Sequence, residues 1–542
     1  MDFVKTEVLI IGGGIAGCFA AIRASEMGRE VVLLEKATIR RSGSVGPGMD
    51  HVFIGVHPET ITLEEAKEHA KACRKELMDP NVILAIYKEA YDRTLDLERF
   101  GIPVREDDGT YFIWKIPERK FYLVSYRGID TKVKLAEAVR KTSTRVIERT
   151  MGVELLCHEG LVVGALGLNT RTGEITSFLA KATILCTGEA GRQYLEPDGP
   201  FVTYFPNTNT GDSEAMSYRA GAELANMEYI YMDYTSVRAG GGIAGIKPFD
   251  KMGYLVNSKG EKVLTKEHST ARGFVMAKEL AEGRGPLYWD FRHLPEDVLA
   301  MYEREMSHEW PVTKEWLKQR GLDLRKDLIP IQLVPTGIIG GPIVDESCQT
   351  SVEGLYVAGA AAAYVMGLTE AAVCGHRAGE SAARHAMEAG EPECDPKFVD
   401  NLKREIIGPL RRHRGANPIE LEKAIRAITT DYVGYFKSGN MMQKGLDKLL
   451  ELKDKYLSTV RAKGPHELMR CLEVRNISDL AEMHIRTSLM RTESRMRRVG
   501  LYPHYRVDYP KTDPSWEKWV VVKRENGKMH LFTKEIPALK EE

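Results

Sequence analysis

Residues 6–17 read TEVLIIGGGIAG, an apolar run that ends in a cluster of glycines. The run is typical of a buried parallel strand, and the residues that follow, CFAAIRASEMG, form a helical stretch. A second apolar run, EVVLLEK, then brings the chain to an acidic residue, Glu35. This order of strand, G-x-G-x-x-G, helix, strand and acid predicts a dinucleotide-binding βαβ unit.

Each part of this unit has a physical role. Gly12 permits the tight turn, Gly14 lets a pyrophosphate approach the backbone, and Gly17 allows the helix to pack closely on the strand. The helix N-terminus then faces the phosphates, and Glu35 is expected to accept hydrogen bonds from ribose hydroxyls. The residues expected to line the dinucleotide on this unit are Gly12, Gly14, Ile15, Ala16, Gly17, Glu35 and Lys36.

Composition excludes several classes of protein. The chain has 542 residues with 76 Lys and Arg against 77 Asp and Glu, so it lacks the basic footprint of a nucleic-acid-binding protein. No apolar stretch is long enough to predict a membrane-spanning helix. The eight cysteines form no C-x-x-C pair, so we expect no zinc or iron–sulfur centre in this chain and no disulfide framework. These features predict a cytoplasmic protein.

Three later segments repeat the pattern of a strand followed by glycines. KATILCTGEAG predicts a buried strand before Thr187 and Gly188, TGDSEAM begins a helix at Asp212, and GLYVAG ends at Gly359. The last segment lies far along the chain. We therefore expect a nucleotide domain in two parts, with a substrate domain inserted between them.

The motifs IIGGGIAG, RSGSVGPG, ATILCTGEAG, TGDSEAMSYRAGAELANME, GLYVAG and HRAGESA together give the chain a specific resemblance. It resembles the flavoprotein group of fumarate reductase, succinate dehydrogenase, L-aspartate oxidase and adenylylsulfate reductase, over most of its length. Two local features are most similar to the adenylylsulfate reductase α subunit: the C-terminal segment from HELMRCLEVRN to HYRVDYP and WEKWVV, and Arg238 in VRAGGGIAG.

The resemblance implies an α/β fold: a discontinuous Rossmann-like FAD-binding domain, an inserted α+β capping domain and a C-terminal helical domain. Four amphipathic stretches between residues 396 and 492 agree with the helical domain, and Asn417 is the expected N-cap of one of them. The aromatic tail beyond Arg498 is expected to be irregular. The expected segments are 1–226 and 345–392 for the FAD-binding domain, 227–344 for the capping domain, 393–500 for the helical domain and 501–542 for the tail.

FAD is the cofactor that the resemblance implies, and we expect it to be bound noncovalently. Relatives that attach FAD covalently do so through a histidine in an R-S-H-T-like segment, where this chain has Gly43. Glu370 is expected near the flavin end of the pocket. The further residues expected to contact FAD are Ser42, Gly43, Ser44, Thr187, Gly188, Asp212, Gly359 and Glu370.

Arginines suit an oxyanion substrate because the guanidinium is always charged and binds planar anions bidentately. The resemblance implies that Arg272 and Arg377 face the substrate, while Arg238 matches a substrate arginine of the adenylylsulfate branch alone. His376, beside Arg377, is a candidate acid or base. Two histidines that bind a dicarboxylate in the family are missing, one from PTGIIGG at residues 335–341 and one near Asp233.

These features favour an FAD-dependent oxidoreductase α subunit that exchanges two electrons with a small anionic substrate. Because the chain carries no iron–sulfur motif, electrons would pass through a separate ferredoxin-like iron–sulfur subunit, as in adenylylsulfate reductase. Two alternatives stay open. One is a soluble fumarate or enoate reductase or dicarboxylate oxidase, and the other is a flavin electron-transfer subunit of a larger complex.

Overall fold

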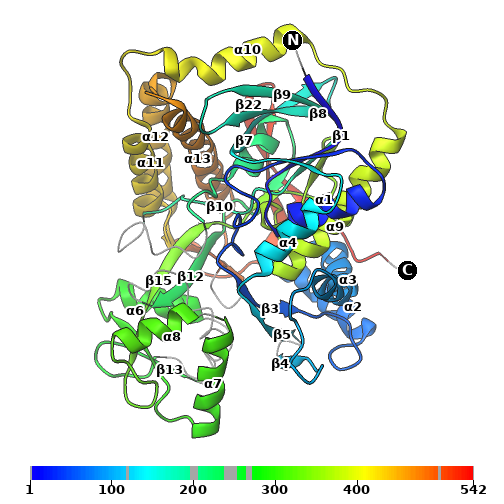
Figure 1. Ribbon diagram of the computed structural model, residues 1–542. Coiled ribbons are helices and arrows are strands. Elements are labelled where there is room, and N and C mark those ends of the chain that lie inside the picture. Colours follow the sequence, from blue (N-terminus) through cyan, green and yellow to red (C-terminus); the bar gives the residue numbers. More distant parts are fainter. Residues whose placement is uncertain are drawn as a thin grey trace.

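The central sheet surrounds the N-terminal strand β1 (Phe3–Ile11). In the computed structural model, β1 lies between β2 (Val31–Leu34) and β9 (Ile175–Leu185) and runs parallel to both, with Ile10 opposite Leu33 and Ile184. The apolar run predicted as a buried strand therefore occupies the middle of the sheet (Figure 1). The structure describes residues 3–116, 121–195, 206–236, 253–263, 272–309, 311–365, 367–497 and 502–540.

The sheet is completed by a strand from much later in the chain. Strand β17 (Leu355–Val357) pairs in parallel with β9, and the helix after it, α9 (Leu368–Glu388), packs on α1 (Ile15–Glu26). The two helices approach closely, because a Cβ at Gly375 or Gly379 would collide with the backbone of α1. The expected discontinuous nucleotide domain is thus confirmed. The remaining strands of this sheet are β6 (Arg145–Ile147), β7 (Thr150–His158) and β8 (Leu161–Asn169).

A second, antiparallel sheet belongs to the inserted capping region. Its longest strand, β15 (Ile329–Ile338), pairs with β12 (Ile230–Ser236) and with the short β10 (Ala190–Gly191), and its own apolar core includes the buried Trp289. Figure 1 shows this region in green at the lower left. The other elements of the region are β13 (Tyr254–Val256), α6 (Arg272–Ala281), β14 (Leu287–Asp290), α7 (Glu296–Glu309) and α8 (Pro311–Gln319).

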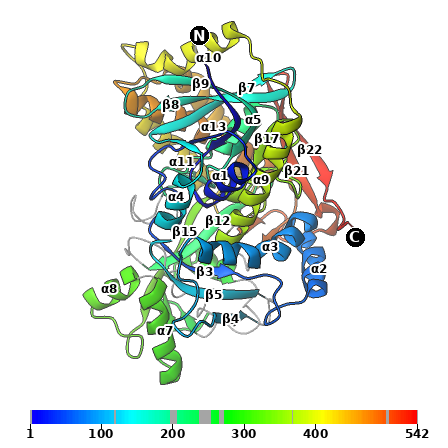
Figure 2. The ribbon, with the colours of Figure 1, turned by 45° about the vertical axis from the view of Figure 1, so that its right-hand side comes forward.

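A three-stranded antiparallel sheet lies beside the capping region. Its middle strand, β5 (Phe121–Gly128), pairs with β3 (Met49–Phe53) and β4 (Phe112–Ile116). Figure 2 shows the sheet between α3 (Pro80–Arg99) above and α7 below. Helix α2 (Leu63–Ala72) packs on α3, and α4 (Thr131–Arg140) packs on α1.

Four helices form the expected helical domain: α10 (Pro396–Ile407), α11 (Pro418–Tyr432), α12 (Gly439–Tyr456) and α13 (Pro465–Met490). Helices α11, α12 and α13 pack on one another around a core of their own. Asn417 is the N-cap of α11, as expected, because its Oδ1 accepts hydrogen bonds from the backbone N–H groups of Ile419 (2.9 Å) and Glu420 (3.4 Å). Among the described residues, no helix combines the length and apolarity needed to cross a bilayer.

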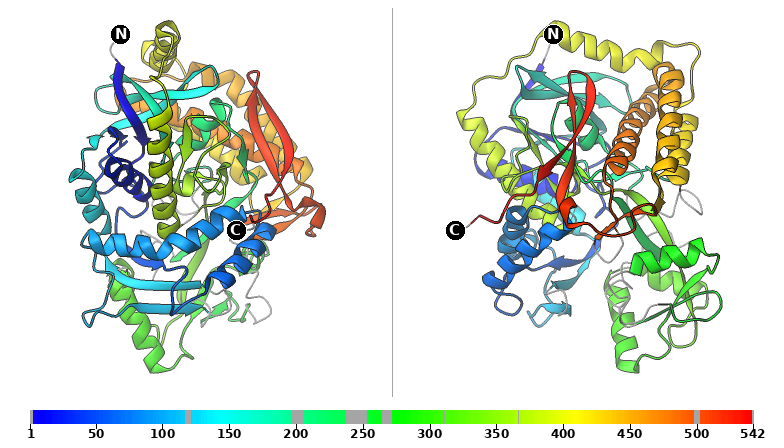
Figure 3. Two further views of the ribbon diagram at one scale, coloured as in Figure 1. Left: turned by 90° about the vertical axis from the view of Figure 1, so that its right-hand side faces the viewer. Right: turned by 180° about the vertical axis from the view of Figure 1, so that it is seen from behind.

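The tail differs from the irregular segment expected from the sequence. It contains a β-hairpin, β21 (Lys518–Glu525) and β22 (Lys528–Glu535), which joins the short strands β11 (Leu224–Ala225) and β16 (Gly341–Pro342). Asn526 and Gly527 form the turn, both with positive φ (50° and 76°), which matches the right-handed twist of the strands. The Asn-Gly pair between two β-rich runs was the sequence signal for this hairpin, seen in red in Figure 3.

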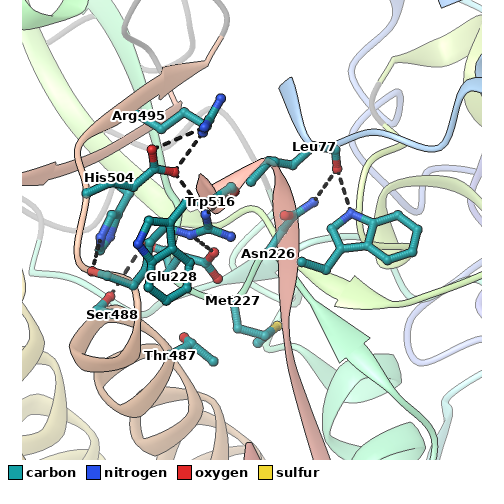
Figure 4. Close-up of polar contacts among 12 residues, drawn as sticks. Leu77, Asn226, Met227, Glu228, Thr487, Ser488, Arg495, His504 and Trp516 are labelled. Atoms are coloured by element: carbon teal, nitrogen blue, oxygen red, sulfur yellow. Dashed lines mark hydrogen bonds and ion pairs between the residues drawn. The ribbon is translucent and has the colours of Figure 1, made fainter. Parts of the chain in front are cut away.

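A polar core connects the end of α13 to the residues before β12. The guanidinium of the fully buried Arg491 donates to Glu228 Oε1 (2.6 Å) and to Glu493 Oε1 (2.9 Å), and Arg495 also donates to Glu493 (2.8 Å). Arg491 further donates to the carbonyl of Trp516 in the tail (3.0 Å). Figure 4 shows these contacts around Glu228 and Arg495, which hold three distant segments together.

Candidate functional site

The glycine turn after β1 has the geometry that a dinucleotide requires. Gly12 has φ = 104°, and a side chain there would collide with the carbonyl of Cys186 at the end of β9. A Cβ at Gly17 would collide with the carbonyl of Gly12, so the helix can start this close to the strand only with glycine. At Gly14 the corresponding position is open, with no atom within 4 Å. The backbone at Gly14 therefore faces the space that a pyrophosphate needs.

Glu35 is held in place by two backbone amides. Its Oε2 accepts from the N–H of Gly13 (2.7 Å) and its Oε1 from the N–H of Ala37 (2.8 Å), and the side chain is 5% exposed. A carboxylate offers about four acceptor positions, and these two bonds leave acceptors for the hydroxyls of a ribose. The placement is the one expected for the acid of a dinucleotide fold.

The loop containing Ser42, Gly43 and Ser44 lies over the glycine turn. Ser42 Oγ donates to the carbonyl of Gly13 (2.9 Å), and a Cβ at Gly43 would lie 3.1 Å from the Cα of Gly14. The loop carries no side chain at position 43, where covalent relatives have their histidine. Noncovalent attachment stays a prediction.

The opposite wall of the site comes from β9 and α5 (Asp212–Arg219). Thr187 Oγ1 lies 2.6 Å from Ser213 Oγ, and Gly188, with φ = 79°, lies against the side chain of Asn209. Asp212 Oδ2 accepts from Lys36 Nζ (3.2 Å). Residues predicted from separate motifs are thus brought together beyond the carboxyl ends of β2 and β9.

A buried ion-pair network ties this site to the helical domain. Glu473 on α13 pairs with Lys36 (2.7 Å) and with Arg192 (2.8 Å), and Arg192 also pairs with Glu422 on α11. Burial alone would raise the pKa of Glu473, but Lys36 and Arg192 outweigh it and lower the pKa to about 2. Arg192, Glu422 and Glu473 were not predicted from the sequence, because no local pattern reveals pairs more than two hundred residues apart.

The second part of the nucleotide domain closes the site from the α9 side. Gly359 follows β17 with φ = 76°, and a Cβ there would lie 3.1 Å from the Cβ of Ala16. The half-buried Glu370 lies in the first turn of α9, with its carboxylate against Gly367. Ile15 and Ala16 are buried in the first turn of α1. Gly359 therefore packs against the first turn of α1.

On the capping side, Arg272 is the first residue of α6. Its guanidinium carbon lies 5.6 Å from the centroid of the Trp289 ring, and the residue is 4% exposed. Helix α6 packs on β15, which also pairs with Gly191 close to the end of β9. Strand β15 therefore connects the region of Arg272 to the dinucleotide site. Arg238 lies outside the described residues.

Arg377 and His376 lie on α9 among charged groups of neighbouring segments. Arg377 donates to Glu89 Oε1 on α3 (2.9 Å) and to the carbonyl of Glu346 (2.6 Å). Burial, together with Arg93 and Arg23, lowers the pKa of His376 to about 3, so this imidazole is neutral at working pH. These contacts favour a role in packing α9 against its neighbouring helices. The expectation that the two residues act on substrate alongside Arg272 stays a prediction.

Glu189 is a buried carboxyl group in this site that was not predicted from the sequence. It accepts hydrogen bonds from Asn209 Nδ2 (2.9 Å) and Ser44 Oγ (3.4 Å), and burial raises its pKa to about 7. Its sequence signal was an acidic residue inside the glycine-rich segment CTGEAG, directly after a buried strand.

Comparisons with known proteins agree with this geometry. Residues 7–375 match the family described as FAD binding domain, and residues 422–539 match the family described as fumarate reductase flavoprotein C-term. A fumarate reductase (CoM/CoB) subunit of Methanothermobacter marburgensis is 28% identical over 96% of this chain and 98% of that protein. An uncharacterized FAD-dependent oxidoreductase of Methanocaldococcus jannaschii is 29% identical over 98% of each chain.

Solved structures share the whole fold. Adenylylsulfate reductase from Archaeoglobus fulgidus superimposes with a TM-score of 0.88 at 22% identity, covering 100% of this chain and 97% of that chain. The expected resemblance to this flavoprotein group is confirmed, and the glycine turn, Glu35 and the open position at Gly14 fit FAD.

Proposed function

This chain belongs to the FAD binding domain family and is an FAD-dependent oxidoreductase of the fumarate reductase group, and we propose that it exchanges two electrons with a small anionic substrate. FAD supplies the redox chemistry when it is bound. The contribution of this chain is to hold the dinucleotide on the glycine turn and Glu35, and to present a buried cation to the substrate.

The observation that carries this proposal is the environment of Arg272. A guanidinium that is 4% exposed and packed on Trp289 is largely removed from water, so its charge acts strongly on a nearby anion. Its planar fork can hold an oxyanion in one orientation. Preorganised donors of this kind stabilise negative charge that develops during reaction.

Adenylylsulfate, or sulfite with AMP in the reverse direction, is the substrate we favour within this class. The overall fold matches adenylylsulfate reductase, and residues 335–341 carry no histidine for a dicarboxylate. Fumarate is the second candidate, because a full-length relative carries the name fumarate reductase. The third candidate function is electron relay without a small substrate. The buried Arg272 disfavours it, because a relay does not need a cation that binds an anionic substrate.

Titration of the oxidised protein distinguishes these candidates. We expect adenylylsulfate or AMP plus sulfite to change the flavin spectrum at lower concentration than fumarate does. Arg272→Ala should keep FAD but lose about 10²–10³ in rate, with poor rescue by Arg272→Lys. Arg292→Ala is the matched control, since Arg292 is exposed and pairs with Asp290 in the same region. A response to fumarate alone at micromolar concentration contradicts the favoured substrate, and full activity of Arg272→Ala contradicts the role of this residue.

A separate iron–sulfur protein is the electron partner that we propose. The eight cysteines are scattered along the chain, and all are free thiols. Single-electron transfer through clusters therefore needs cysteines from another protein chain. Native purification followed by iron analysis tests this proposal. An iron-free single chain with full turnover against its natural electron donor contradicts it.

A further inference from the structure

Glu189 places an ionisable group directly beside the FAD site. The residue is 6% exposed, and its Oε1 accepts from Ser44, which belongs to the loop that lies over Gly14. Its second partner, Asn209, comes from the segment that precedes α5. Glu189 is thus fixed from two sides of the site.

The charged neighbours of Glu189 do not neutralise it. Lys36 is engaged by Asp212 and Glu473. Arg192, three residues further along the chain, is engaged by Glu422 and Glu473. On α5, Asp212 and Glu214 add acidic groups to the same region. Burial without an ion pair in the described part of the chain disfavours the carboxylate, and its pKa rises to about 7.

Glu214 is a natural control for Glu189. It is fully buried, and neither carboxylate oxygen has a hydrogen-bond partner in the described structure. Burial therefore raises the pKa of Glu214 well above its ordinary value. Glu214 shares the burial of Glu189 but is hydrogen-bonded to neither Ser44 nor Asn209, so it separates the effect of burial from that of position beside the loop.

We propose that binding of FAD is coupled to the uptake of a proton by Glu189. The two phosphates of FAD bring negative charge to the turn at Gly14, close to the loop that contacts Glu189. Negative charge nearby favours the neutral carboxyl group over the carboxylate. The coupling is reciprocal, so ionisation of Glu189 must weaken the binding of FAD to the same degree. Affinity for FAD then falls as the pH rises above about 7.

Calorimetric titration of the full-length, FAD-depleted chain with FAD tests this coupling without substrate or partner, so its outcome is independent of the proposed reaction. Repeating the titration in buffers of different ionisation enthalpy gives the number of protons taken up. We expect uptake of roughly 0.5–1 proton per FAD at pH 8 and almost none at pH 5.5.

Glu189→Gln copies the neutral carboxyl group, because its amide oxygen can accept the bonds from Ser44 and Asn209. This variant should bind FAD with no proton uptake at pH 8, and Glu214→Gln should behave as the unmodified protein does. Uptake that persists in Glu189→Gln overturns the proposal. If that variant does not fold, the unmodified protein still decides, since no uptake at pH 8 overturns the proposal by itself.

Discussion

The glycine turn between β1 and α1 and the buried polar core around Glu228 are held in place by different kinds of contact. At the turn, backbone approaches backbone, and Gly12 and Gly17 leave no room for a side chain. In the polar core, the long side chain of Arg491 bridges Glu228 and Glu493. The turn requires glycines without side chains, whereas the polar core requires that each buried charge has a partner of opposite charge.

This difference determines what each region tolerates. A side chain added at the turn meets rigid backbone, so the cost is steric and cannot be relieved by a rotamer change. A side chain removed from the polar core leaves a buried charge without its partner. The glycine turn is formed by residues that are close along the chain, whereas the polar core joins the distant residues 228, 491 and 516.

The largest effect is expected from Gly12→Ala, compared with Gly14→Ala. Alanine at position 12 needs φ = 104° and collides with Cys186, so we expect a loss on the order of 3 kcal/mol or more in the free energy of unfolding. Gly14→Ala should fold almost normally, because its Cβ meets open space, but it should not bind FAD. Denaturant unfolding and FAD fluorescence measure the two properties. Equal destabilisation by both variants contradicts this account of the turn.

Removal of the central cation should break the polar core. We expect Arg491→Met to lower the free energy of unfolding by about 3–5 kcal/mol, because Glu228 and Glu493 stay buried without their partner. Arg384→Ala is the control, since this exposed arginine pairs with Glu380 on the helix surface and should change stability by about 0.5 kcal/mol or less. Urea unfolding measures both. A small effect of Arg491→Met means that water replaces the ion pairs.

Acid should weaken the ion-pair network between the FAD site and the helical domain. The folded-state pKa of Glu473 is depressed to about 2, so its stabilisation is complete above the unfolded-state pKa near 4.5 and is lost as the pH falls toward 2. The shift corresponds to about 3 kcal/mol. When thermal unfolding is measured between pH 2 and 6, the midpoint temperature of Glu473→Gln should fall less steeply with decreasing pH than that of the unmodified protein. Glu296→Gln, which removes an exposed ion pair with Arg325, should show the same steep fall of the midpoint temperature as the unmodified protein.

The smallest effect concerns the start of α11. Asn417→Ala removes the acceptor for the N–H groups of Ile419 and Glu420, and we expect a loss of about 1 kcal/mol in stability. Asn417→Asp keeps the acceptor and should retain most of the stability. Urea unfolding measures the difference, and an unchanged Asn417→Ala shows that water caps this helix equally well.

The nucleotide site was predictable because its residues are constrained locally. A positive φ and a close approach of backbone both require glycine, and the dinucleotide fold requires an acid after β2. These requirements appear in the sequence at fixed spacing, as in Gly12, Gly17 and Glu35. The direction in which Arg377 points was not evident from its motif. Gly375 and Gly379 are four residues apart and mark the face toward α1, so Arg377, two residues before Gly379, turns toward α3 instead.

Contacts between segments that are distant in the chain have no corresponding pattern in the sequence. Arg192 meets Glu422 and Glu473 only because the folded chain brings three segments together. Likewise, the hairpin of the tail has a local signal in Asn526 and Gly527, but its pairing with β11 depends on the whole fold. The spacing of residues in the sequence predicts contacts between residues that are close along the chain. The partners of long charged side chains are determined by the tertiary structure.

The late position of β17 and α9 has a consequence for synthesis of the protein. While the ribosome is still making the capping region, the emerging chain already contains β1, α1 and β9 but neither β17 nor α9. The surface of α1 that later receives Gly375 and Gly379 is then exposed to solvent and to other chains. Nascent chains that end before residue 355 should therefore retain no FAD, and we expect cofactor loading to begin only after α9 has left the ribosome.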